Sequence, residues 1–164
     1  MFGSLFLAAG LFLGGDAAAD AANLANYSSY REAWDAAKDE QRPMLVVLNP
    51  AEGDAKAQAL HVAELRKDAA LSEVLNEYVV AEIDTSTEQG KKVLEVFKSP
   101  ALPRIVVIDN QQKNQVFATS TKVSNDRLKT VLDTYKDGKT EMVSFDWMPK
   151  PKADCPNCRL RLGL

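Results

Sequence analysis

Three β-like runs separated by helical segments constrain the fold of this chain more than any other feature. The runs are Met44–Leu48, Val79–Asp84 and Arg104–Asp109. Met44–Leu48 is apolar throughout, which is typical of a strand covered on both faces. Because strands that alternate with helices favour a sheet with helices on both faces, these runs predict an α/β fold.

Helical periodicity fills the segments between the runs. Ser29 and Glu32 have the spacing of a capping box, which predicts a helix to about Glu40. We expect further helices over about 54–77, with a break near Asp68, over 88–97, and after Ser124. Gln115–Thr119 follows a hairpin-type connection and adds an antiparallel edge strand, so the prediction is a central mixed sheet of about four strands.

Length and charge exclude several classes of protein. A chain of 164 residues is expected to form one folded domain. The formal net charge is -3 with acidic and basic residues interspersed, so there is no broad basic surface for a nucleic-acid partner. The expected partner is a protein or peptide and not a nucleic acid.

The N-terminal region has the character of an export signal. Leu5–Leu13 is apolar but too short to span a bilayer, and Ala17–Ala19 supplies the small residues of a cleavage site. No Lys or Arg precedes Arg31, so the usual positive start is missing. We expect residues 1–22 to be a signal peptide, or else an apolar arm. The first interpretation implies an exported (periplasmic or secreted) protein with membrane contact only through an uncleaved segment, and the alternative is cytoplasmic.

The order of elements, with a proline directly before the third strand, resembles the thioredoxin superfamily. The resemblance is carried by Met44–Ala57, Tyr78–Asp84 and Val96–Asp109, and it spans about residues 28–138. It is closest to thioredoxin-like domains of exported bacterial proteins. It implies a thioredoxin-like fold for residues 23–138, and Pro103 matches the position of the family's cis-proline.

The resemblance stops at the usual redox site. Family members that exchange disulfides carry Cys-x-x-Cys where a helix N-terminus stabilises a thiolate. Asp54 and Ala57 occupy those two positions here, and neither can attack a disulfide. Asp54 is also an ordinary helix N-cap. Conventional thioredoxin activity is therefore not expected.

A peptide-binding role is implied by the same resemblance. In the family, the residue before the cis-proline offers its backbone to an extended peptide, which pairs like a strand. Leu102 is that residue, so Leu102 and Pro103 are the candidate peptide-binding residues. The alternative is that Pro103 only shapes a tight loop.

The two cysteines of the chain, Cys155 and Cys158, lie in a Cys-Pro-Asn-Cys box within the tail, residues 139–164. As catalytic residues they would perform thiol–disulfide exchange, helped by nearby Lys and Arg. As metal ligands they would supply half of a zinc site that bridges two chains, because His61 is the one other candidate ligand of the soft type. The third interpretation is a structural disulfide or two inert thiols.

The sequence therefore predicts a thioredoxin-like module that binds a protein or peptide and needs no cofactor. The alternatives are a thiol–disulfide oxidoreductase that uses Cys155 and Cys158, and a zinc-binding tail that bridges a dimer. The oligomeric state stays open at this point.

Overall fold

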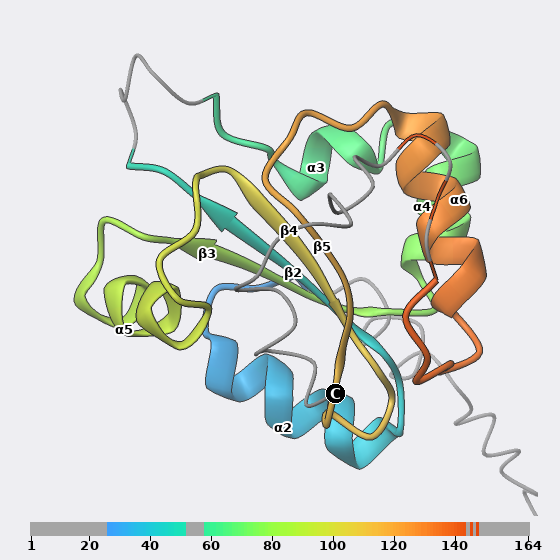
Figure 1. Cartoon of the computed structure of the whole chain (residues 1–164), viewed down its shortest axis with the longest axis horizontal. Coiled ribbons are helices and arrows are strands. Elements are labelled where there is room, and N and C mark those ends of the chain that lie inside the picture. Colours follow the sequence, from blue (N-terminus) through green and yellow to red (C-terminus); the bar gives the residue numbers. More distant parts are fainter. Residues whose placement is uncertain (1–25, 52–57, 144, 146, 148–164) are drawn as a thin grey trace, which may run out of the picture.

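The computed structural model describes residues 26–51, 58–143, 145 and 147. The described residues form a five-stranded sheet with helices on both faces (Figure 1). The strands are β1 (Asn26–Tyr27), β2 (Met44–Asn49), β3 (Val79–Asp84), β4 (Arg104–Ile108) and β5 (Gln115–Thr119). The predicted α/β class and mixed sheet are confirmed.

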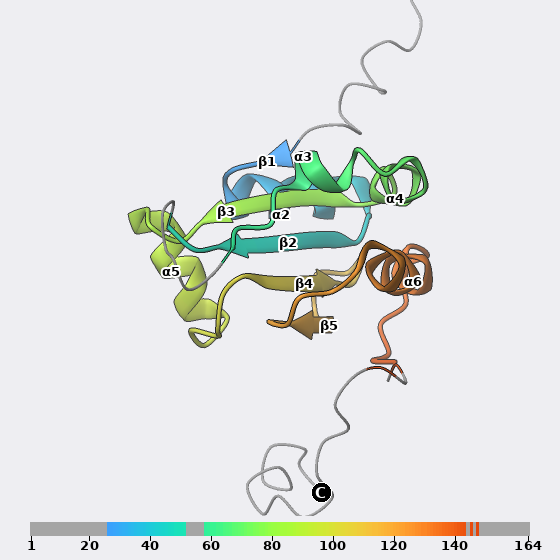
Figure 2. The ribbon, with the colours of Figure 1, turned by 90° about the horizontal axis from the view of Figure 1, so that it is seen from above.

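The sheet order is β1-β3-β2-β4-β5. β3 pairs in parallel with both β1 and β2, whereas β4 is antiparallel to β2 and to β5. Figure 2 shows the strands side by side in this order. β1 is the strand that the sequence did not predict, since two residues are too few to display an alternating pattern.

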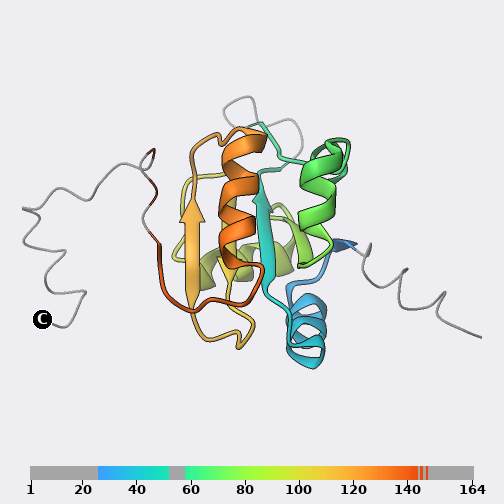
Figure 3. The same ribbon diagram turned by 90° about the vertical axis from the view of Figure 1, so that its right-hand side faces the viewer.

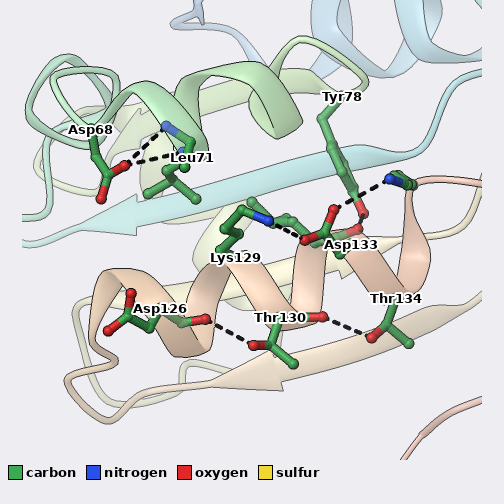
Figure 4. Close-up of polar contacts among 11 residues, drawn as sticks. Asp68, Leu71, Tyr78, Asp126, Lys129, Thr130, Asp133 and Thr134 are labelled. Carbon is green, nitrogen blue, oxygen red and sulfur yellow. Dashed lines mark hydrogen bonds and ion pairs between the residues drawn. The ribbon is translucent and has the colours of Figure 1, made fainter.

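The helices are α2 (Tyr30–Glu40), α3 (Val62–Leu65), α4 (Ala69–Leu75), α5 (Glu88–Val96) and α6 (Asn125–Tyr135). The four predicted helical segments contain these five helices. The segment expected to be helical from Asp54 begins its helix later than predicted. Residues 58–61 are not helical, and α3 begins only at Val62. The expected break is at Asp68, whose Oδ1 accepts the N–H groups of Ala70 and Leu71 at 3.1 and 3.3 Å and so begins α4 (Figure 4).

The core divides between the two faces of the sheet because the side chains of β2 alternate. Leu45 and Val47 point to a cluster with α3, α4 and α6, and Met44, Val46 and Leu48 point to a cluster with α2 and α5. Figure 3 shows the first face, with α6 in orange and α4 in green. Both faces are covered, which explains why this strand is apolar along its length.

The chain after α6 returns to the first face. Val143 N–H donates to the hydroxyl of Tyr135 at 2.7 Å, and the Phe145 ring packs edge-on against Phe117 at 5.9 Å. Trp147 also packs on this cluster. The described residues of the segment 140–145 form no strand.

Within the described ranges, no helix combines the length and apolar character that a membrane span requires. The predicted signal peptide, residues 1–22, lies outside them.

Candidate peptide-binding groove

A cavity of about 570 Å³ lies on the first face, between α3, the start of α6 and the loop before β4. Its floor is apolar and its rim is polar. The apolar side chains are Ala59, Leu60, Leu65, Leu102, Pro103, Ile105, Val123 and Leu128, and the polar ones are Gln58, His61, Glu64, Thr121, Lys122 and Asn125. We call this cavity the groove. An apolar floor with a few polar groups is the usual character of a binding site.

Leu102 and Pro103, the residues predicted to bind peptide, both line the groove. The peptide bond between them is cis. They lie just outside the sheet ladder, because the β2–β4 pairing ends at Leu48 and Arg104. Among the described residues, the backbone N–H and C=O of Leu102 have no hydrogen-bond partner. These two groups are therefore open to an extended segment that pairs with them.

The opposite wall of the groove is fixed by Asn49, at the end of β2. Its Oδ1 accepts the N–H of Leu60 at 2.8 Å, and its Nδ2 donates to the C=O of the same residue at 3.0 Å. The side chain amide thus pairs with Leu60 as a neighbouring strand would. Leu60 is held against the sheet although it lies in no helix or strand.

Glu82 of β3 extends this attachment. Its Oε2 accepts the N–H of Val62 at 3.1 Å, and its Oε1 accepts from Asn49 Nδ2 at 3.1 Å. His61 Nδ1 lies 2.9 Å from the same Oε1, so the Nδ1 proton is donated to the carboxylate. We call Asn49, Glu82 and the segment 60–62 the clamp. It positions the groove wall through charge-assisted hydrogen bonds, which are stronger than neutral ones.

His61 differs from its predicted setting. It was expected within a helix but precedes α3, and 56% of its side chain is exposed on the groove rim. Its place beside Glu82 makes it part of the clamp. In the described part of the chain there is no group of three or more His, Cys, Asp or Glu side chains able to hold a metal.

Arg104 directly follows Pro103 and begins β4. Its Nη1 donates to the Ser120 hydroxyl at 3.2 Å, and burial lowers its pKa from the ordinary value. The side chain is half-buried beside β5. It belongs to the support of the loop before β4.

Four predicted residues fall outside the described ranges: Asp54 and Ala57, at the positions of the family's cysteines, and Cys155 and Cys158 of the tail. Thiol exchange and zinc binding by the tail therefore stay predictions of the sequence. The sequence reasoning missed Asn49 and Glu82. The one available signal was the carboxylate of Glu82 between the apolar residues Ala81 and Ile83 of β3.

Comparison with known proteins identifies the fold. No family model and no curated protein matches this sequence. Among solved structures, a thioredoxin from Thermus thermophilus aligns with a TM-score of 0.53 and 16% identity, covering 66% of this chain and 85% of its own. The chain therefore has the thioredoxin fold.

Two other solved structures are similar to this chain at lower TM-scores. A thioredoxin-fold protein from Helicobacter pylori has a TM-score of 0.49 and 15% identity, and covers 71% of this chain and 88% of its own. The disulphide isomerase from Xylella fastidiosa Temecula1 has a TM-score of 0.47 and 16% identity, and covers 79% and 98%.

Proposed function

We propose that this thioredoxin-fold chain is a protein- or peptide-binding module whose groove receives an extended segment. The observation that carries the proposal is the combination of an apolar floor with the backbone groups of Leu102 at its edge, which have no hydrogen-bond partner within the described residues. An extended peptide gains affinity from backbone pairing, and it gains specificity from alternate side chains that enter pockets.

The rigidity of the groove supports this function. The clamp ties one wall to β2 and β3, and the other wall is the buried start of β4 and the N-terminal half of α6. A site that is formed before binding loses little conformational entropy when the ligand arrives. The chemistry of such a site is recognition, and no group within it is needed as a nucleophile.

A peptide-binding assay on the full chain tests the proposal. Ligands would be selected from a library of random peptides of about ten residues, which are about 33 Å long when extended. Their affinities would be measured by fluorescence anisotropy. Leu102→Asp places a charge on the apolar floor, and Gln58→Trp fills the groove from an exposed rim position. We expect each substitution to weaken binding at least about tenfold, or about 1.4 kcal/mol.

Val96→Asp is the matched control, because Val96 is 66% exposed on α5 and does not line the groove. It should leave the affinity unchanged, and circular dichroism should show that all three variants are folded. Selected peptides that bind all three variants as well as they bind the wild type would contradict the proposal.

A further inference from the structure

We propose that the occupant of the groove in the free protein is the chain's own C-terminal segment Arg159–Leu164, which a partner must displace. This inference rests on the proposed function, because it needs a groove that accepts extended peptides. It adds regulation of the same site: the module is self-occupied, and a partner binds only by competition.

The sequence of the segment matches what the groove requires. Leu160, Leu162 and Leu164 alternate with Arg159, Arg161 and Gly163. In an extended chain, successive side chains point to opposite sides, so the three leucines share one face and the two arginines lie on the other. Such a segment can place its leucine face in an apolar groove while its arginine face stays in solvent.

The structure brings the described end of the chain to the N-terminal part of α6. The Trp147 ring packs 6.2 Å from Phe117, and the Arg127 guanidinium lies 5.3 Å from the centroid of the Trp147 ring. Arg127 is followed directly by Leu128, which lines the groove. The last described residue is thus attached to the same part of α6 that forms one wall.

The remaining chain is long enough to reach the groove. Residues 148–159 connect Trp147 to Leu160, and an extended chain of that length spans up to roughly 40 Å. The sequence places Pro149 and Pro151 in the first part of this connection, and proline favours an extended backbone. A short tether of this kind gives an effective concentration in the millimolar range. Even a segment with a low intrinsic affinity for the groove would therefore occupy it.

The charged residues on the rim of the groove neither strongly attract nor exclude the arginine face of the segment. Glu64 of α3 lies on the rim with 63% of its side chain exposed, but its carboxylate already accepts from Lys67 Nζ at 2.7 Å. Lys122 lies on the rim as well, so charge adds little net attraction. The leucine face is the main contribution to binding.

The test compares two full-chain double variants by amide and methyl NMR. Leu160→Ser with Leu162→Ser removes the apolar face, and Ala153→Ser with Gly163→Ser alters the same tail without touching that face. We expect the first pair to shift the signals of groove residues such as Leu60, Leu65 and Ile105, and the control pair to leave those signals at their wild-type positions. Groove signals that are identical in all three proteins would overturn the inference.

A synthetic peptide of residues 153–164, with Cys155→Ser and Cys158→Ser, provides the second measurement. If its intrinsic dissociation constant is on the order of 100 μM, a millimolar tethered competitor weakens its apparent affinity about tenfold. We therefore expect the peptide to bind the Leu160→Ser, Leu162→Ser variant about tenfold more tightly than the wild type. Equal affinity for both proteins would overturn the inference.

Three further outcomes separate this inference from the function on which it rests. Groove shifts that weaken on hundredfold dilution would assign the occupant to a second copy of the chain, and so overturn occupancy by its own tail. If library peptides bind the groove but the tail substitutions change nothing, self-occupation fails while the peptide-binding function stands. If no peptide binds either protein, both fail.

Discussion

At the scale of single residues, Glu82 links three elements that are distant in the sequence. Its carboxylate accepts hydrogen bonds from Asn49 of β2, from His61 and from the backbone of Val62 in α3. Asn49 in turn holds Leu60 by two hydrogen bonds. The groove wall therefore depends on a few polar side chains and not only on apolar packing.

Replacing Glu82 should test this dependence. Glu82→Ala removes the acceptor of the Val62 N–H and one of the two acceptors of Asn49 Nδ2, which should lower the free energy of unfolding by about 1–3 kcal/mol. Urea denaturation measures the loss, and Glu95→Ala, at an exposed position of α5, should change stability by less than about 0.5 kcal/mol. Equal stability of the two variants would mean that the clamp does not hold the wall.

At the scale of elements, the N-termini of α4 and α6 show how differently two capping residues can act. Both begin with a preferred capping residue, Asp68 for α4 and Ser124 for α6. The Asp68 side chain accepts two backbone N–H groups, whereas the Ser124 side chain makes no such bond. The same sequence signal thus has two different structural outcomes.

We expect Asp68→Ala to cost about 0.5–2 kcal/mol, because two N–H groups of α4 lose their acceptor. Ser124→Ala should cost much less, since no side-chain hydrogen bond is lost. Thermal and urea unfolding of both variants measure the difference. A cost for Ser124→Ala that equals the cost for Asp68→Ala would refute this account of the helix ends.

How far the elements could be predicted depends on local signals. The strands β2, β3 and β4 were predictable because runs such as Met44–Leu48 have no other stable setting than a covered sheet. The segment 58–61 has helical spacing but is not helical, since the clamp holds Leu60 to β2 through side chains that no local pattern reveals. In the site, Leu102 and Pro103 could be found from the family's loop, but Asn49 and Glu82 could not, because their partners are distant in sequence.

At the scale of the whole molecule, buried tyrosines connect the helices to the sheet. The Tyr78 hydroxyl donates to the C=O of Leu132 at 2.7 Å, which joins the start of β3 to α6 (Figure 4). Burial, with smaller contributions from Asp133 and Asp137, raises the pKa of Tyr78 well above its ordinary value. Burial also raises the pKa of Tyr30 to about 12 and raises the pKa of Tyr135.

These shifts predict the sign of the alkaline pH dependence. A folded-state pKa above the unfolded value means that the stabilisation is complete below about pH 10 and is lost as the pH rises toward the folded pKa. Between about pH 10 and 12, one fully buried tyrosine contributes a slope of about 1.4 kcal/mol per pH unit. We expect the free energy of unfolding of Tyr78→Phe to fall less steeply with pH than that of the wild type, by this amount. Urea unfolding at several pH values in this range measures the difference. Parallel curves for wild type and variant would contradict the shift.

The most direct test of the central claim, that the groove binds extended segments, is an isotope-filtered NMR measurement. The full chain would carry labelled Leu, Ile and Val methyl groups, and the ligand would be an unlabelled peptide selected for binding. The account predicts nuclear Overhauser contacts from the peptide to groove methyls, such as those of Leu60, Leu102 and Ile105. Contacts confined to the opposite face, for example to Leu94 and Val96 of α5, would contradict it.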